Sequence, residues 1–340
     1  MEDPAAQPIL AIDLGGTQIR AAYISPDLTV SCRRAVATDE EEGVDAVVGR
    51  ICDLARTVRD EADAAQLPAP RGVGISAPGP LDSRRGVVVA PPNLSGWRDV
   101  PLSDRVQDVT ELPTFLERDT NVGLVTEWRF GAARGTRTAV YITVSTGIGG
   151  GLLIDGRQLL GIDGAAGEVG HLTVELDGPL CGDGQPGHVE AIGSGTAIAR
   201  EGRALLERNA SAPLAALAGD APEVDAEMVA RAADEGDPAC GAILQRAWTG
   251  IGAAAATLVN LLNPEVIVFG GSISVHRPDM LAAVREAVAR RAFPIPAQRV
   301  RLELAHHSED VSLLGWLPLW NERIHDPAFG RVVPPKLEET

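Results

Sequence analysis

Hydrophobic runs alternate with glycine-rich turns along this chain, and the pattern predicts an α/β protein. The apolar run ILAIDL at residues 9–14 stops at Gly15-Gly16, and QIRAAYI at residues 18–24 follows with rough alternation. A strand, a tight glycine turn and a second strand together predict a β-hairpin. Residues 139–145, AVYITVS, meet TGIGGG before the chain resumes as LLIDG, which predicts a second strand, glycine turn and strand.

The remaining elements follow from the same periodicities. Helical spacing predicts helices at 44–64, 120–130 and 278–291, and short apolar runs predict strands at 72–76, 113–117 and 265–271. Asp237-Pro238 is a favourable N-cap and first-turn pair that opens an alanine- and leucine-rich helix. Asn263-Pro264 ends that helix near Leu262.

Composition narrows the class of protein. The 340 residues suffice for two packed domains, and no apolar run approaches the roughly 20 residues of a membrane span. The four cysteines lie far apart and form no disulfide framework, so we expect a cytoplasmic protein that does not bind membranes. The net charge of −17 matches nucleic acid poorly and is otherwise consistent with simple solubility.

Lys336 in the C-terminal tail is the only lysine. Any phosphate binding must therefore use backbone N–H groups, Thr or Ser hydroxyls, arginine or a metal ion. A P-loop requires its lysine, and neither DLGGTQIRAA nor GIGGGL has the G-x-G-x-x-G spacing and following helix of a dinucleotide fold. A hairpin turn with two glycines can present backbone N–H groups to a phosphate. A plain turn is the alternative for any single Gly-Gly pair.

Four segments resemble one superfamily when they are taken together. AIDLGGTQIRAA resembles the first phosphate loop of the actin/hexokinase/sugar-kinase superfamily, STGIGGGLLIDG its second, and LLNPEVIVFGGSIS its adenosine-side segment. GAAGEVGH, followed by C-x-D-G-x-x-G-H-x-E, is similar to the signature of the ROK family of repressors, unnamed reading frames and sugar kinases. The resemblance covers about residues 8–320. Only eight residues precede the DLGGT strand, where ROK repressors carry a helix-turn-helix, so the kinase branch is implied.

The resemblance implies a two-domain actin-like ATPase fold (ribonuclease H-like) with a cleft between α/β domains. The first domain would span 1–120 with about 310–324, the second 121–309, and 325–340 would be a flexible tail. A homodimer is implied by the family. The expected reaction is ATP-dependent phosphorylation of a hexose, with glucose to glucose 6-phosphate first. Fructose, mannose and N-acetylmannosamine stay open as substrates, and the alternative function is a non-catalytic sugar-binding regulator.

Residues for ATP and Mg²⁺ are implied by the same motifs. The expected ATP- and phosphate-binding set is Asp13, Gly15, Gly16, Thr17, Thr146, Gly147, Gly149, Gly270 and Gly271. Asp13 would face the magnesium ion through water, with capping of the turn as its alternative role. The last two glycines would let the chain pass close to the adenine or ribose.

A sugar hydroxyl needs a base to remove its proton, and a carboxylate in a partly dry site can do this. The resemblance places the family base at Asp119 in ERDTN. Asp119 follows a short predicted strand and precedes a helix, and substrate sites of α/β folds cluster at the carboxyl ends of strands. A helix N-cap aspartate is the alternative.

The family binds its sugar through residues that match five further positions here. These are Gly79, Asn93, Glu168, His171 and Glu190. The kinase pattern often has Asn before the base, where this chain has Arg118. Because a guanidinium is larger and accepts no hydrogen bond, either Arg118 turns away or the hexose preference differs.

The family zinc site would map onto His171, Cys181, Asp183 and His188, although the usual ligands are one histidine and three cysteines. Zinc accepts His, Cys and Asp in tetrahedral geometry, so a structural Zn²⁺ is possible with the altered set. The alternative is a metal-free loop in which Asp183 binds local backbone amides. Either way, the loop would hold the sugar-binding residues in place.

Overall fold

A computed structural model describes residues 7–91, 94–219, 224–307 and 309–329. The chain divides into two compact units. The first comprises Met1–Arg129, Leu160–Ala166 and Glu309–Thr340, and the second comprises Phe130–Leu159 and Gly167–Ser308. Within the described ranges, no helix is both long and apolar enough to cross a membrane.

A five-stranded sheet forms the centre of the first unit. Its strands are β1 (Ile9–Leu14), β2 (Gln18–Ile24), β3 (Val30–Ala37), β4 (Val73–Ala77) and β7 (Thr114–Arg118). Their order is β3-β2-β1-β4-β7, with the β1–β2 and β2–β3 pairs antiparallel and β1, β4 and β7 parallel. A separate ribbon pairs β5 (Leu81–Asp82) with β6 (Val87–Val88).

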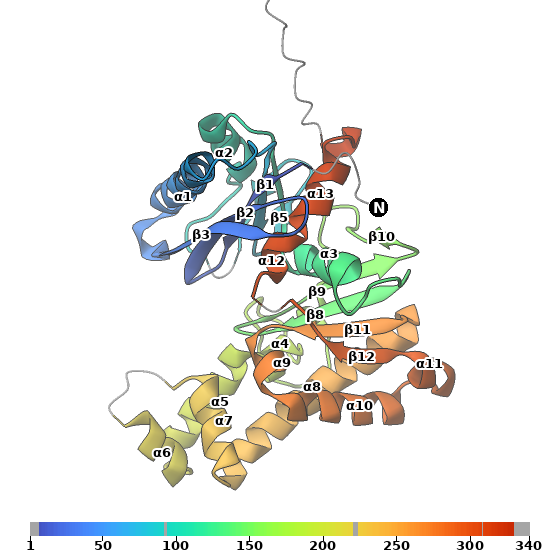
Figure 1. The fold of residues 1–340 in the computed structure, drawn as a ribbon. Coiled ribbons are helices and arrows are strands. Elements are labelled where there is room, and N and C mark those ends of the chain that lie inside the picture. Colours follow the sequence, from blue (N-terminus) through green and yellow to red (C-terminus); the bar gives the residue numbers. More distant parts are fainter. Residues whose placement is uncertain (1–6, 92–93, 220–223, 308, 330–340) are drawn as a thin grey trace, which may run out of the picture. The chain divides into compact units, whose positions relative to one another are not determined.

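Helices cover both faces of this sheet (Figure 1). They are α1 (Val44–Ala64) and α2 (Leu102–Thr110) on one face, and α3 (Asp119–Phe130), α12 (Val311–Leu314) and α13 (Trp316–Arg323) on the other. The alternation of β1 explains this arrangement. Leu10, Ile12 and Leu14 pack in the cluster that contains α1, whereas Ile9 and Ala11 pack with α3, α12 and α13. A strand covered on both faces is a nearly continuous apolar run, and in ILAIDL Asp13 is the one polar residue.

The second unit repeats the strand pattern of the first. Its strands are β8 (Ala139–Val144), β9 (Ile148–Ile154), β10 (Arg157–Gln158), β11 (Val266–Gly270) and β12 (Arg301–Leu304). They follow the order β10-β9-β8-β11-β12, antiparallel up to β8 and parallel from β8 to β12. Each sheet therefore has a glycine hairpin beside its central parallel strands.

The longest described helix of the second unit is α8 (Pro238–Leu262). The others are α4 (Glu190–Gly193), α5 (Gly195–Glu207), α6 (Ala212–Ala218), α7 (Ala226–Asp234), α9 (Ser272–His276), α10 (Pro278–Arg291) and α11 (Pro294–Arg299). Of these, α4, α5, α7, α10 and α11 pack against α8. Helix α8 begins where the sequence predicts, because Asp237 Oδ1 accepts from the N–H groups of Ala239 and Cys240 at 2.8 and 2.9 Å. Short 3₁₀ turns occur at Glu40–Glu42, Val169–His171 and Pro327–Phe329.

The second hairpin differs from its prediction in where the turn lies. Its tight turn is at Ser145–Gly147, where Ser145 N–H donates to Gly147 O at 2.9 Å. Gly149 and Gly150 belong to β9, since they pair with Thr143 and Ile142 across the sheet. The prediction that the whole TGIGGG segment is the turn was therefore wrong.

The end of the chain also differs in detail from the sequence-based expectation. The predicted helix at about 310–324 is broken at Gly315, where a Cβ atom would lie 2.3 Å from Val122 O of α3. Helix α3, expected in the second domain from residue 121 on, belongs to the first unit up to Arg129, because Val122 packs with α12 and α13. Phe329 is buried against Phe115, and residues 330–340 of the predicted tail lie outside the described residues.

Candidate active site

The first glycine loop is fixed by hydrogen bonds from a buried threonine. Gly15 N–H donates to Gln18 O at 3.0 Å, which closes the hairpin turn. Thr38 Oγ1 donates to Gly15 O at 2.7 Å, and Thr38 N–H donates to Thr17 O at 2.9 Å. Thr17 is exposed and Gly16 is half-buried, so the tip of the loop stays accessible to a ligand. Thr38 was not among the predicted site residues, because no local motif marks it.

Two of the predicted carboxylates lie at one edge of the first sheet. Asp13 of β1 is in register with Ser76 of β4, and Ser76 is in register with Glu117 of β7. Asp119 follows two residues after Glu117, where β7 ends and α3 begins. Because β1, β4 and β7 are parallel, Asp13 and Asp119 share the carboxyl edge of the sheet, which is where α/β folds bind substrates.

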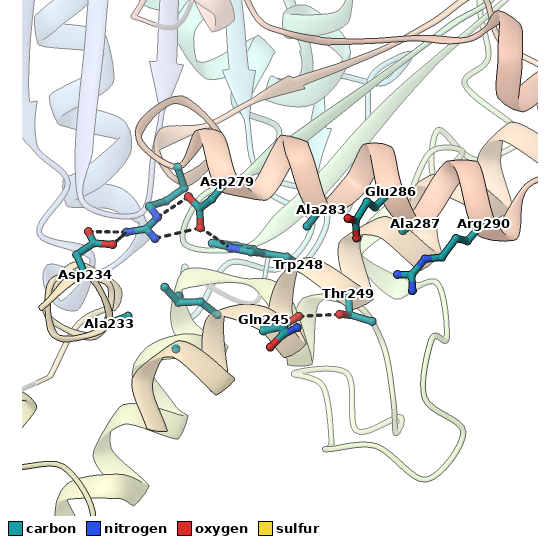
Figure 2. A pocket seen from close by; sticks show the side chains of 13 residues that line it. Ala233, Asp234, Gln245, Trp248, Thr249, Asp279, Ala283, Glu286, Ala287 and Arg290 are labelled. Carbon is teal, nitrogen blue, oxygen red and sulfur yellow. Dashed lines mark hydrogen bonds and ion pairs between the residues drawn. The ribbon is translucent and has the colours of Figure 1, made fainter. Parts of the chain in front are cut away.

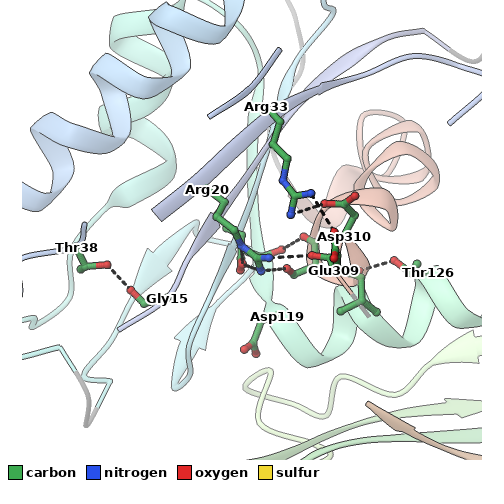
Figure 3. A network of polar contacts seen from close by, with 12 residues as sticks. Gly15, Arg20, Arg33, Thr38, Asp119, Thr126, Glu309 and Asp310 are labelled. Atoms are coloured by element: carbon green, nitrogen blue, oxygen red, sulfur yellow. Dashed lines mark hydrogen bonds and ion pairs between the residues drawn. The ribbon is translucent and has the colours of Figure 1, made fainter. Parts of the chain in front are cut away.

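Asp119 is half-buried and opens α3. Its Oδ1 accepts the N–H of the adjacent Thr120 at 2.7 Å, a local contact that differs from an N-cap bond, which comes from an N–H further into the helix. Figure 3 shows its carboxylate pointing away from the two labelled arginines. The backbone before it is held from below: Glu117, 1% exposed, forms an ion pair with Arg323 of α13 and accepts from the side chain of Asn121 at 3.0 Å.

Arg118 is turned toward a backbone carbonyl. Its guanidinium Nη2 donates to Ala166 O, and the side chain is buried. Ala166 lies in the segment Leu160–Ala166, which belongs to the first unit. The sequence left two possibilities, that Arg118 turns away from the sugar or that the hexose preference differs. The structure shows the Arg118 guanidinium hydrogen-bonded to the backbone of Ala166, directly before Asp119 in the chain.

The second glycine loop is fixed by a glutamate. Glu190 Oε2 accepts the N–H of Ile148 at 2.8 Å, and a Cβ atom on Gly147 would lie 2.7 Å from the same oxygen. Thr146 is exposed at the tip, and its carbonyl accepts from the hydroxyl of Thr196 at 2.9 Å. The predicted sugar-binding residue Glu190 therefore also supports the predicted phosphate loop.

The third glycine turn has a packing requirement of its own. A Cβ atom on Gly270 would lie 2.1 Å from the hydroxyl of Tyr141, and one on Gly271 would lie 2.4 Å from Val144 O. Gly271 also has a φ of +86°, which disfavours other residues. These contacts to β8 account for both glycines without a ligand.

The other predicted sugar residues are distributed over both units. Gly79 lies in the first unit before a cis peptide to Pro80, and Asn93 falls outside the described residues. Glu168 directly precedes the 3₁₀ turn Val169–His171 of the second unit, and His171 ends that turn. The structure thus brings His171 and Glu190 into one neighbourhood with the cysteine-containing loop.

Four potential metal ligands converge in that neighbourhood. One ligand atom from each of His171, Cys181, Asp183 and His188 lies within 4.8 Å of the others. Asp183 Oδ2 lies 3.1 Å from His171 Nδ1 and 3.4 Å from His188 Nδ1, and the two nitrogens are 3.2 Å apart. Tetrahedral zinc with bonds of about 2.1 Å separates its ligands by about 3.4 Å, so the spacing of the two histidine nitrogens and Asp183 Oδ2 fits this ion.

The surroundings of the cluster also suit a cation. Asp183 Oδ1 accepts the N–H of Gln185 at 3.0 Å, which fixes the carboxylate with Oδ2 toward the histidines. This backbone bond, followed by the charges of the histidines, lowers the pKa of Asp183. Burial raises the pKa of the Cys181 thiol, whose Sγ lies 3.8 Å from Glu190 Oε1. A bound metal ion would oppose that rise by stabilising the thiolate.

A pocket of about 310 Å³ lies elsewhere in the second unit, between α7, α8 and α10. Arg277 bridges Asp234 and Asp279 there, and Trp248 Nε1 donates to Asp279 at 2.9 Å (Figure 2). The lining contains none of the predicted site residues. The contacts of Arg277 with Asp234 and Asp279, together with the Trp248–Asp279 bond, join the three helices.

Comparisons with known proteins agree with these motifs. The family model described as "ROK family" matches residues 9–323. A glucokinase of Thermotoga maritima is 34% identical over 316 residues, which cover 93% of this chain and 98% of that protein. An N-acetylmannosamine kinase of Citrobacter koseri is 33% identical and covers 90% and 96%.

A solved structure extends the likeness to the fold. The ROK family glucokinase from Streptomyces griseus, in complex with glucose and AMPPNP, is 30% identical, with a TM-score of 0.78 and coverage of 92% of this chain and 98% of that one. The predicted two-domain actin-like α/β fold is thereby confirmed. The chain belongs to the ROK family.

Proposed function

We propose that this protein is a sugar kinase that transfers the γ-phosphoryl group of ATP to a hexose, with glucose as the sugar and its 6-hydroxyl as the acceptor. The observation that carries the proposal is the likeness to the Streptomyces griseus glucokinase over 92% of the chain. The sharing of one sheet edge by Asp13 and Asp119 supports it independently.

Asp119 is the proposed general base. The sugar oxygen forms a bond to the γ-phosphorus, the bond from that phosphorus to the β–γ bridging oxygen breaks, and ADP leaves. The hydroxyl proton passes to the Asp119 carboxylate, whose Oδ1 is held by the Thr120 N–H. Such proton transfer contributes about 10²- to 10⁴-fold to a rate.

The nucleotide is assigned to the glycine turns. Gly15, Gly16 and Thr17 would bind phosphate through N–H and hydroxyl groups, as would Thr146, Gly147 and Gly149 of the second unit. Gly270 and Gly271 would let the chain pass close to the adenosine. Asp13 would hold Mg²⁺ through water: among the residues that the structure describes, its hydrogen bonds go to Oδ2, which leaves Oδ1 for such a contact. When bound, the ion would neutralise phosphate charge.

The sugar is assigned to Glu168, His171 and Glu190, with Gly79 and Asn93 as further contacts. Cys181, Asp183 and His188 would complete a structural Zn²⁺ site together with His171, and the ion would fix the loop that leads into α4 and Glu190. The link from Cys181 Sγ to Glu190 Oε1 at 3.8 Å supports this coupling. The homodimer and the cytoplasmic location stay predictions.

A panel of hexoses with ATP and Mg²⁺ tests the function. We expect sugar-dependent ADP release, greatest with glucose, and a product phosphorylated at the 6-hydroxyl by ³¹P NMR. Preference for N-acetylmannosamine, the substrate in the name of the Citrobacter koseri relative, would move the proposal to that sugar. Thermal stabilisation by glucose but not by Mg-AMPPNP, with no ADP release, would favour the non-catalytic regulator instead.

A further inference from the structure

Arg20 of β2 lies directly across the hairpin from Asp13. The two residues are a register pair of the antiparallel strands β1 and β2. Arg20 Nε donates to Asp13 Oδ2 at 3.1 Å, and Nη2 donates to the same oxygen (Figure 3). Both bonds thus converge on one atom of the carboxylate.

The remaining contacts of Arg20 go to the C-terminal segment Glu309–Ser312. Nη1 donates to Glu309 O at 2.8 Å, and Nη2 lies 3.3 Å from Ser312 Oγ. The side chain of Asp13 is 10% exposed and that of Arg20 27%, so solvent screens the pair only in part. A single guanidinium therefore joins β1, β2 and the last part of the first unit.

That segment is itself fixed to the rest of the unit. Ser312 O accepts the hydroxyl of Ser76 at 2.6 Å, and Val311 O accepts the hydroxyl of Thr126 at 2.6 Å. Ser76 lies on β4 beside Asp13, and Thr126 lies on α3, the helix that Asp119 opens. Arg20 is thus bonded to a segment, Glu309–Ser312, that also contacts α3, the helix of the proposed base.

The two carboxylate oxygens of Asp13 therefore differ: Oδ2 accepts both bonds from Arg20, and Oδ1 is available to a ligand. Within the part of the chain that the structure describes, Asp13 Oδ1 has no hydrogen-bond partner, whereas Oδ2 has two donors. An untethered carboxylate would rotate between equivalent orientations and would have to be ordered when a ligand binds. The guanidinium removes that freedom in advance.

We propose that Arg20 is a positioning residue for magnesium: it holds Asp13 Oδ2 so that Oδ1 faces the metal–nucleotide complex. This inference rests on the proposed function, which assigns Mg-ATP to Asp13. A guanidinium is required because its planar fork reaches Asp13 and Glu309 O together, whereas an ammonium is a point charge. Outer partners of this kind typically change metal affinity by 10- to 100-fold.

The test measures the dissociation constant of AMPPNP with Mg²⁺ and with EDTA, by calorimetry, for wild type, Arg20→Met and Arg20→Lys. We expect Arg20→Met to weaken binding about 10-fold with Mg²⁺ and less than about 2-fold with EDTA. Arg20→Lys should give a smaller loss, about 3-fold, because it keeps the charge but not the fork. The matched control is Arg33→Met, which removes an arginine that pairs with Glu309 and Asp310 but not with Asp13. It should bind like wild type.

A cycle with Asp13→Asn separates this inference from the proposed function. If Arg20 acts through Asp13, Arg20→Met should cause no further loss in the Asp13→Asn background. Equal losses with Mg²⁺ and EDTA would overturn the inference, because Arg20 would then attract phosphate by charge. A normal Mg²⁺ response in Asp13→Asn itself would instead contradict the proposed role of Asp13.

Discussion

The two glycine hairpins look alike in sequence but are fixed by opposite means. In the first, the hairpin contributes a carboxylate, Asp13, which an arginine holds, and a hydroxyl of Thr38 binds the loop carbonyl. In the second, the loop contributes an N–H group, that of Ile148, and a carboxylate from outside the hairpin, Glu190, accepts it.

The difference shows which parts of the protein each loop depends on. The first hairpin is joined through Arg20 to the C-terminal segment and contains the proposed magnesium contact. The second is joined through Glu190 to Cys181. Cys181 lies in the cluster of potential metal ligands that also contains His171, a proposed sugar contact. We therefore expect substitutions at the second hairpin to weaken the binding of sugar and nucleotide together. Substitutions at the first hairpin should weaken the binding of the nucleotide alone.

Among changes to the residues that support the two hairpins, the largest effect should come from Glu190→Ala. Loss of a hydrogen bond to a charged group costs about 1.5–3 kcal/mol, and Glu190 is also one of the proposed sugar-binding residues, so kcat/KM should fall about 100-fold. KM should rise for both glucose and Mg-ATP. Glu207→Ala, an exposed glutamate of α5, serves as control. A change in KM for only one substrate would contradict the proposed link between the second hairpin and the sugar contacts.

Loss of the metal should have the next largest effect. Purified protein should contain one zinc ion per chain, and His188→Ala should lose it, lower the melting temperature and raise KM for glucose about 10-fold. Metal analysis by mass spectrometry measures the content. Cys32→Ser, a cysteine outside the cluster, should keep the ion. Zinc-free wild type with full activity and stability would contradict the zinc site.

A smaller effect is expected at the first hairpin from Thr38→Val. The isosteric change removes only the bond to Gly15 O, worth about 0.5–1.5 kcal/mol, so KM for Mg-ATP should rise about 5-fold. KM for glucose should stay at the wild-type value. Steady-state kinetics with each substrate varied would detect an equal rise in both constants, which would erase the contrast between the hairpins.

The smallest kinetic effect should come from Asp237→Ala, at the cap of α8 far along the chain from either loop. Unfolding in urea should show a loss of about 1 kcal/mol with unchanged kcat/KM. The hydroxyl of Ser211 and the N–H groups of Cys240 and Ala239 lower the pKa of Asp237 from its ordinary 3.8. Because the folded pKa is depressed, this stabilisation is present above pH 3.8 and is lost as the pH falls below it. Altered kinetics would mean that α8 supports the site.

Much of the fold was predictable from local patterns. β1, β2, α1 and α8 match their predicted ranges closely, since uninterrupted apolar runs, helical spacing and the Asp237-Pro238 cap are local signals. The family and the class of enzyme were predicted from the glycine and histidine motifs, and both are confirmed by the relatives. The pairing of Gly149 with Thr143 was not predictable, because glycine favours turns until a partner strand specifies otherwise.

The supports of the site were harder to predict than its motif residues. Arg20 and Thr38 act through contacts to Glu309 and Gly15, which depend on strand pairing and chain return rather than on spacing. The alternation of QIRAAYI does place Arg20 on a definite face, and the hairpin register would have paired it with Asp13. The segment that receives its other donors lies 289 residues further along, beyond any local pattern.

The central claim is that Asp119 is the base of a hexose kinase, and glucose-dependent ADP release by wild type and Asp119→Asn tests it most directly. The amide can still accept the Thr120 N–H, so Mg-AMPPNP should bind normally. We predict a rate lowered by about 10³-fold in the variant. A variant that releases ADP within about 10-fold of the wild-type rate would contradict the account.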